Sequence, residues 1–351
     1  MTNPLVSVVM PVYNAEKYLR QAIESILNQV FDNFEFIIIN DGSTDSSVEI
    51  IKSYKDPRII LIENQINRGL VYSLNKGLDA SRGDFIARMD ADDISLPHRL
   101  QRQVNFLNDN PDIGVVGTAY LPIDEYKNPV LPPMFRPEYP AGAKWYLLLG
   151  SPLGHPTAMY RKALIQEAGG YHEGYSHAED YELWTRMSQI TKICSIKDIC
   201  LLYRITDKYR VSNKYQSEQL QNSIRIRKIA YRQLFGGNMS DAIASWIQGY
   251  DEGLFDNTSY DACFLLSRAY ETLLEKYPFN SSDEKKDLKI TVETNLLTIV
   301  GKIKNPYIIL KLFFRPFVFS RKAFIKTLMN INKGRVSRSL NLRQKMDSTH
   351  F

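Results

Sequence analysis

An alternation of short apolar runs with amphipathic runs, repeating about every 25 residues over the first 117 residues, limits what this chain can fold into. The apolar runs are rich in β-branched residues and carry few charges, as buried strands do. The runs between them place apolar residues on one helical face. We expect strands over 5–10, 35–39, 58–63, 84–89 and 113–117, and helices over about 16–28, 45–54, 69–80 and 97–108. The alternation predicts an α/β fold whose mostly parallel sheet is covered by helices on both faces.

The alternation ends at residue 117, and the rest of the chain differs in composition. Residues 120–140 are rich in proline and polar residues, so we expect them to run over the surface beside a cleft. From 211 to about 304, apolar residues recur at helical intervals without a cluster of reactive side chains. The sequence therefore predicts an α/β domain over 1–210, a helical extension over 211–305 and a tail over 306–351. The helical extension would serve for packing, self-association or contact with a partner.

The composition is that of a globular protein with a sizeable core, because 44% of the 351 residues are hydrophobic and 24% are charged. The first ten residues lack a basic leader, and no apolar run reaches the roughly 18 residues of a membrane span. Cys194, Cys200 and Cys263 lack metal-ligand spacing, and an odd number of thiols suits a reducing compartment. These observations predict a cytoplasmic protein.

The net charge of +5 comes from the end of the chain. Residues 301–351 contain 12 Lys and Arg and one Asp, which leaves a net charge of −6 for residues 1–300. Within 306–345, apolar and aromatic residues are interrupted by cations, a pattern that suits the headgroup region of an anionic membrane surface. A core helix with a solvated basic face explains the pattern equally well. We expect no nucleic acid partner, because the basic residues lack the fold context of a known nucleic-acid-binding domain.

Three carboxylates, those of Asp90, Asp92 and Asp93, follow the fourth expected strand and precede a helix. Carboxylates crowded on one turn repel one another unless a cation lies between them. An acidic turn that caps the following helix is the alternative explanation, and for an isolated pair of acids it is at least as common.

Polar residues also follow the first and second expected strands, where Tyr13 and Asp41 lie. Ligands of parallel sheets bind beyond the carboxyl ends of the strands, so these residues should face one crevice with the three carboxylates. No glycine-rich dinucleotide or triphosphate motif occurs. A ring that can stack on a base, a carboxylate that can accept a proton, and an acidic cluster together suit a nucleotide diphosphate bridged by a divalent cation.

Two further acids, Glu179 and Asp180, lie at the expected start of a helix. Pairing of acids with the positive end of a helix dipole is a common structural reason for such a position. His172 and His177 resemble a zinc motif but are five residues apart, which misses the spacing of four that one helical face requires. The sequence therefore predicts no zinc site.

Taken together, short motifs in a fixed order resemble the family 2 glycosyltransferases with the GT-A fold. The resemblance covers about residues 5–205. It is carried by Pro11-Val-Tyr-Asn14, Asn40-Asp-Gly-Ser-Thr-Asp45, Asn67-Arg-Gly69, Leu74-Asn75, Ala87-Arg-Met-Asp-Ala-Asp-Asp93, Pro97-x-Arg99, His155-Pro156 and Ala178-Glu-Asp-Tyr-Glu-Leu-Trp184.

The resemblance implies an inverting transfer from a nucleotide-activated sugar, commonly a UDP sugar, to an acceptor hydroxyl of a glycan or a lipid-linked glycan. Tyr13 and Asp41 resemble the family's base-binding residues, and Pro11 and Asn14 resemble those that shape the same loop. Arg68 and Arg88 resemble phosphate-binding positions, although structural ion pairs explain arginines there at least as often.

The resemblance also implies the roles of the acids. Asp90 and Asp92 match the ends of the Asp-x-Asp motif, so both would ligate Mn²⁺ or Mg²⁺, with Asp90 also approaching the nucleotide. Asp180 resembles the general base. Thr206 stands where the family often has a histidine, which removes one expected metal or phosphate contact. A sugar nucleotidyltransferase and a non-catalytic, sugar-binding scaffold are the competing functions.

Overall fold

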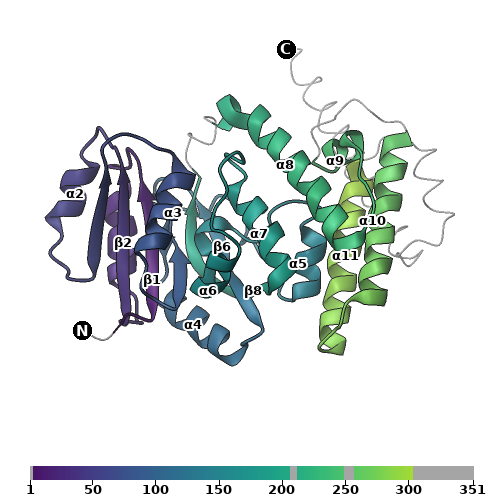
Figure 1. Ribbon diagram of the computed structural model, residues 1–351, viewed down its shortest axis with the longest axis horizontal. Helices are drawn as coiled ribbons and strands as arrows, with labels where there is room; N and C mark the ends of the chain where they lie inside the picture. Colours follow the sequence, from purple (N-terminus) through teal and green to yellow (C-terminus); the bar gives the residue numbers. More distant parts are fainter. Residues whose placement is uncertain (1–2, 206–211, 249–256, 303–351) are drawn as a thin grey trace, which may run out of the picture. The chain divides into compact units, whose positions relative to one another are not determined.

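The computed structural model describes residues 3–205, 212–248 and 257–302 (Figure 1). In chain order, its strands and helices are β1 Val6–Val12, α1 Leu19–Leu27, β2 Phe34–Asp41, α2 Ser47–Ser53, β3 Ile59–Asn64, α3 Leu70–Ala80, β4 Phe85–Arg88, β5 Ile94–Ser95, α4 Arg99–Asp109, β6 Ile113–Ile123, α5 Pro140–Tyr146, η1 His155–Thr157, β7 Met159–Arg161, α6 Lys162–Glu167, α7 Glu179–Ile190, β8 Lys192–Arg204, α8 Ser212–Phe235, α9 Asp241–Gln248, α10 Asn257–Lys276 and α11 Ser282–Lys302.

One eight-stranded sheet organises the first part of the chain, in the order β3-β2-β1-β4-β7-β6-β8-β5. β1 pairs in parallel with β2 and β4, β2 with β3, and β6 with β8. The short β7 runs antiparallel to β4 and β6, and β5 runs antiparallel to β8 at the sheet edge. The predicted α/β class and mostly parallel sheet are therefore confirmed.

Both faces of the sheet are buried. Successive strand residues point to opposite sides, so neighbouring residues of one strand enter different core clusters. Val8 and Met10 of β1 join a core cluster with the apolar faces of α1, α2 and α4. Val9 lies between them in sequence and joins the opposite cluster, which contains residues of α3, α6, α7 and α8. Helix α3 approaches β1 closely at Gly77, where an added Cβ would lie 2.4 Å from Cγ1 of Val9.

Three strands depart from the expectation. β6 continues to Ile123 rather than ending at 117, because it pairs with β8 along almost its whole length. The two-residue β5 and the long β8 were not predicted. β5 follows the acidic turn directly, so that turn is anchored at one end by β4 and at the other by β5.

The described residues divide into two compact units, one that ends at Asn238 and one that begins at Met239. α8 lies in the first unit and packs on α7. The predicted domain boundaries at 210 and 305 stay predictions. Among the described residues, no helix combines the length and apolar character needed to span a membrane. The tail over 306–351 lies outside the described residues, so its predicted contacts stay predictions.

Candidate functional site

A pocket of about 500 Å³ opens where β1 and β4 end. The loop after β1, the acidic turn after β4, the tip beyond β6 and the end of β8 all contribute to its wall. The lining residues are Pro11, Tyr13, Asn14, Ala15, Lys17, Tyr18, Asp90, Ala91, Asp92, Asp124, Glu125 and Ile205. Five of the predicted site residues, namely Pro11, Tyr13, Asn14, Asp90 and Asp92, thus share one pocket.

The loop after β1 is held to the loop after β2 by reciprocal hydrogen bonds. The N–H of Asn14 donates to Oγ of Ser43 at 3.1 Å, and Oδ1 of Asn14 accepts from the N–H of Thr44 at 2.8 Å. Asn14 has a φ of 49°, a left-handed conformation that asparagine tolerates better than most residues. Tyr13 beside it is 50% exposed, so its ring is available at the pocket for stacking.

Asp41 and Arg68 do not line the pocket. The buried carboxylate of Asp41 accepts hydrogen bonds from Nδ2 of Asn64 at 2.7 Å and from the N–H groups of Arg68 and Gly69, each at 2.9 Å. The guanidinium of Arg68 lies 4.6 Å from the ring centroid of Tyr72. In this arrangement Asp41 fixes the turn before α3, and the predicted nucleotide contacts of Asp41 and Arg68 stay predictions.

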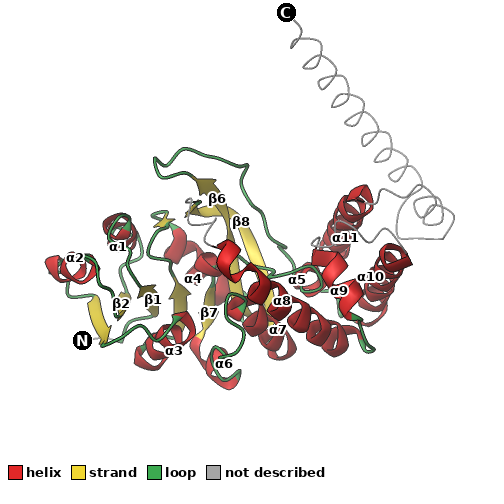
Figure 2. Cartoon of the chain, turned by 90° about the horizontal axis from the view of Figure 1, so that it is seen from above, coloured by secondary structure: helices red, strands yellow, loops and turns green. Residues whose placement is uncertain are grey.

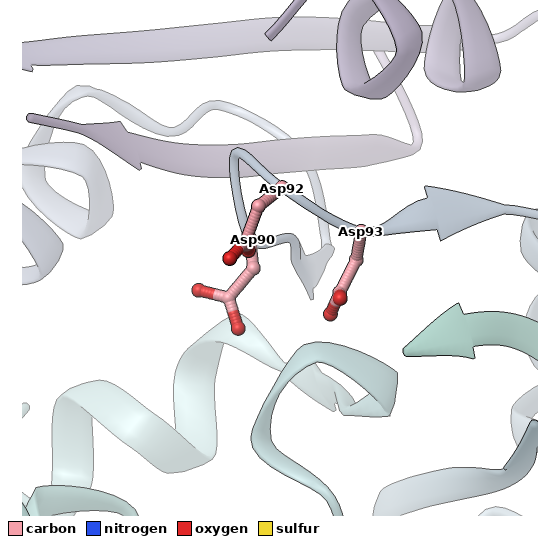
Figure 3. Close-up of side chains that lie close together, drawn as sticks. All are labelled: Asp90, Asp92 and Asp93. Atoms are coloured by element: carbon pink, nitrogen blue, oxygen red, sulfur yellow. The ribbon is translucent and has the colours of Figure 1, made fainter. Parts of the chain in front are cut away.

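The three aspartates of the acidic turn lie together (Figure 3). One carboxylate oxygen from each of Asp90, Asp92 and Asp93 lies within 4.8 Å of the others. Burial and the Asp90 charge raise the pKa of Asp92 to about 6, and burial raises the pKa of Asp93 well above its usual range. Oδ2 of Asp93 is buried without a hydrogen-bond partner. Such crowded oxygen ligands fit a hard divalent cation, which would offset their repulsion.

Arg204, at the end of β8, holds the acidic turn in place through hydrogen bonds. Its N–H donates to Oδ1 of Asp93 at 2.8 Å, and its Nε donates to the carbonyl of Asp92 at 2.8 Å. One terminal nitrogen donates to the carbonyls of Asp124 and Glu125, both at 3.0 Å, and the other donates to the side chain of Gln21. Arg204 is 1% exposed, and it joins the acidic turn to Asp124 and Glu125, which also line the pocket.

A second arginine, Arg88, acts electrostatically on both the acidic turn and the predicted base. It is buried at the end of β4 and forms an ion pair with Asp90. Burial lowers the pKa of Arg88, but attraction to Asp90 outweighs this and raises the pKa above its usual range. The Arg88 charge also lowers the pKa of Asp180 and of Glu179, so one guanidinium acts on both groups of acids.

Asp180 begins α7 together with Glu179, as the sequence predicts. Oδ2 of Asp180 accepts a hydrogen bond from Oγ of Ser151 at 2.9 Å. Burial raises the pKa of Asp180, and the nearby Ser151, Arg88 and Arg136 oppose that rise. Burial and the Asp180 charge raise the pKa of Glu179 to about 7, and Asp90 acts in the same direction. The two acidic groups, about 90 residues apart in sequence, therefore influence one another across the fold.

Several site residues were not identified from the sequence. Lys17 and Tyr18 lie in a stretch expected to be helical, but α1 begins only at Leu19. Arg204 was not predicted as a site residue. Its role depends on β8 pairing with β5, which no local pattern shows. Thr206 lies outside the described residues.

Comparison with known proteins identifies the family. The sequence model described as "Glycosyl transferase family 2" matches residues 7–169. A putative glycosyltransferase, EpsE, of Bacillus subtilis is 40% identical over 191 residues, which are 53% of this chain and 67% of that protein. The O-antigen biosynthesis glycosyltransferase WbnJ of Escherichia coli is 35% identical over 190 residues, 52% of this chain and 71% of that protein.

The chain belongs to glycosyl transferase family 2. The matched stretch is about half of this glycosyltransferase and about two thirds of each of these relatives.

Solved structures show the same fold. The Staphylococcus aureus TarS fragment 1–349 in complex with UDP-GlcNAc aligns with a TM-score of 0.55 and 18% identity over 95% of this chain and 91% of that one. The mannosyltransferase PcManGT of Pyrobaculum calidifontis in complex with GDP-Man and Mn²⁺ aligns with a TM-score of 0.53 and 17% identity over 86% of this chain and 87% of that one. The expected GT-A fold of this glycosyltransferase is thus confirmed.

Proposed function

We propose that this glycosyltransferase moves a sugar from a nucleotide diphosphate donor, a UDP sugar in the first instance, to an acceptor hydroxyl with inversion at the anomeric carbon. The observation that carries the proposal is the pocket at the ends of β1 and β4, which brings the half-exposed ring of Tyr13 together with the carboxylates of Asp90 and Asp92. The charge of Arg88, which pairs with Asp90, also acts on Asp180, so the acids that would hold the cation and the acid that would activate the acceptor influence one another.

The pocket supplies the donor site in this proposal. The half-exposed ring of Tyr13 would stack on the nucleotide base, with Pro11 and Asn14 shaping that loop and Asp41 and Arg68 supporting or contacting the nucleotide. Asp90 and Asp92 would hold Mn²⁺ or Mg²⁺. Such a cation, when bound, offsets the negative charge that develops on the departing diphosphate.

The reaction follows as a single displacement. The acceptor oxygen forms a bond to the anomeric carbon while the bond from that carbon to the phosphate oxygen breaks, and the nucleotide diphosphate leaves with the electron pair. The acceptor's proton passes to Asp180, whose orientation is fixed by Ser151. Attack on the face opposite the leaving group inverts the configuration.

The biological setting is also part of the proposal. The name of one relative refers to O-antigen biosynthesis, which supports a role in assembling a surface polysaccharide or a lipid-linked glycan. We place the enzyme in the cytoplasm, peripheral to the membrane through the basic residues 306–345, and we expect any oligomer to form through the helical extension.

A donor screen tests the proposal. Thermal shift with Mn²⁺ or Mg²⁺ and a panel of UDP and GDP sugars should show stabilisation by one donor class, because a ligand that binds the folded state stabilises it. Metal-dependent transfer or hydrolysis of that donor should follow and should be lost in Asp92→Ala. Release of pyrophosphate from a nucleoside triphosphate and a sugar phosphate would favour the nucleotidyltransferase instead. Binding without turnover would favour the scaffold.

A further inference from the structure

The connection between β6 and α5, residues 124–139, exposes an unusual amount of apolar surface. Figure 2 shows this loop extending away from the sheet. The exposed apolar residues of the loop are Tyr126 at 76%, Val130 at 45%, Leu131 at 51%, Met134 at 37% and Phe135 at 58%. Clustered apolar exposure of this kind marks a surface that binds something, whereas single exposed apolar residues need no explanation. We call residues 126–135 the apolar loop.

The apolar loop is fixed to the sheet. The N–H of Met134 donates to the carbonyl of Tyr120 at 2.8 Å, and the N–H of Tyr120 donates back at 3.2 Å. The N–H of Val130 donates to the carbonyl of Pro122 at 3.0 Å. Four prolines, Pro129, Pro132, Pro133 and Pro137, further restrict the backbone. The apolar side chains are therefore presented on an ordered backbone.

A cation follows the apolar loop directly. The half-buried guanidinium of Arg136 donates hydrogen bonds to the hydroxyl groups of Tyr146 at 2.7 Å and Tyr120 at 3.1 Å. No carboxylate of the described residues lies within ion-pair distance of Arg136, and its buried Nε has no hydrogen-bond partner there. The ring of Tyr120, to whose hydroxyl Arg136 donates, lies beside Gly154, where an added Cβ would be 3.0 Å from Cε1 of that ring. Ser151 of the same segment as Gly154 hydrogen-bonds Asp180. Arg136 also acts electrostatically on Asp180.

Three features thus lie in the same part of the molecule: the exposed side chains of the apolar loop, the guanidinium of Arg136, which has no carboxylate partner among the described residues, and the predicted base Asp180. The same loop begins with Asp124 and Glu125, which line the donor pocket. We propose that the apolar loop and Arg136 bind a lipid-linked acceptor, with the aliphatic chain on Leu131 and Phe135 and the lipid's phosphate beside Arg136. This inference rests on the proposed transfer and names the acceptor class for that site.

Charge and polarity favour this occupant. A soluble glycan would need hydrogen-bonding partners, which the side chains of Val130, Leu131, Met134 and Phe135 do not offer. It would also leave Arg136 without a counter-charge. An aliphatic chain joined to a phosphate satisfies both features, because apolar burial and a charge-assisted contact then occur side by side.

Vesicle binding tests the proposal with the full-length chain. The probes are phosphatidylcholine vesicles, the same vesicles with an isoprenoid phosphate, and vesicles with equally charged phosphatidylglycerol. Wild type should prefer the isoprenoid phosphate. The double variant Leu131→Ser/Phe135→Ser should bind those vesicles about tenfold or more weakly, since two apolar contacts are lost. Arg136→Gln should lose the preference for phosphate over neutral vesicles, whereas Arg136→Lys should keep part of it.

A matched control separates the loop from general surface effects. Val30 and Ile290 are similarly exposed, at 56% and 53%, and Val30→Ser/Ile290→Ser should bind the vesicles as wild type does. All variants retain residues 306–345, so any vesicle contact of that tail is common to them. Stabilisation by UDP with Mn²⁺ reports that the loop variants are folded.

Three results would overturn the proposal: undiminished binding by the loop double variant, equal binding of wild type to phosphatidylglycerol and isoprenoid phosphate vesicles, or conversion of a wild-type dimer to a monomer by the loop substitutions. The last would assign the apolar loop to a second copy of the chain. Metal-dependent transfer or hydrolysis of the donor distinguishes the two levels, because its presence with any of these results refutes only the acceptor assignment, and the absence of both activities refutes the proposed transfer itself.

Discussion

The N–H of Arg204, at the end of β8, donates a 2.8 Å hydrogen bond to Oδ1 of Asp93, which lies 111 residues earlier. The Nε–H group of the same arginine donates a hydrogen bond to the carbonyl of Asp92. The carboxylates that would bind a cation therefore depend on a residue outside their own turn.

Arg204→Lys should weaken the apparent affinity for Mn²⁺ by about 10- to 100-fold, because lysine cannot reproduce the fork of donors and supporting contacts of a metal site carry effects of this size. Activity titrated against Mn²⁺ measures the shift. Arg161→Lys is the control, since Arg161 likewise donates to backbone carbonyls, those of Ile113 and Leu107, but none of these partners lines the pocket. Equal loss of metal affinity in both variants would reduce Arg204 to a general stabilising role.

Asp180→Asn should lower kcat by about 10²- to 10⁴-fold while leaving the Kd for UDP nearly unchanged, because the carboxylate is needed for proton removal and not for donor binding. Steady-state kinetics and calorimetry separate these quantities. Ser151→Ala, which keeps the carboxylate but removes its 2.9 Å hydrogen bond, should cause a much smaller loss. Parallel losses in turnover and UDP binding would argue against the assignment of Asp180 as the base.

Tyr13→Ala should raise the Kd for UDP about tenfold or more, since stacking of a base on an aromatic ring contributes roughly 1–3 kcal/mol. Tyr13→Phe keeps the ring and should bind nearly as wild type does. Tyr13 is half-exposed, so neither substitution should change stability much. If the phenylalanine variant binds as weakly as the alanine variant, the ring does not stack on the base.

Glu179 should make the metal-free protein less stable as pH rises. Its pKa is raised from 4.5 to about 7 by burial and then by Asp180, so the folded state binds the proton more tightly than the unfolded state. Stability should therefore fall between about pH 4.5 and 7, by up to about 3 kcal/mol from this group. Denaturation with EDTA at several pH values measures the slope.

Glu179→Gln should flatten that slope and raise stability at pH 8. Glu182→Gln on the same helix is the matched control: it breaks the 2.7 Å ion pair with Arg186 and should lower stability instead. A wild-type slope that Glu179→Gln leaves unchanged would contradict the assignment.

The parts of the fold that the sequence predicts are those with local signals. β1, β2 and α1 to α4 follow from apolar periodicity, and the acidic turn after β4 follows from its position between a strand and a helix. β5 and β8 are stabilised by pairing with distant segments, so no window of sequence reveals them. The role of Arg204 was missed for the same reason, because it depends on groups brought together by the sheet.

The position of β5 has a consequence for how the site is assembled. The acidic turn runs from β4, inside the sheet, to β5, which forms the far edge of the sheet and pairs with β8. A fragment ending at residue 169 would carry all three aspartates but neither β8 nor Arg204. During synthesis, then, the acidic turn should acquire its final geometry only after β8 has been made, long after its own carboxylates have left the ribosome.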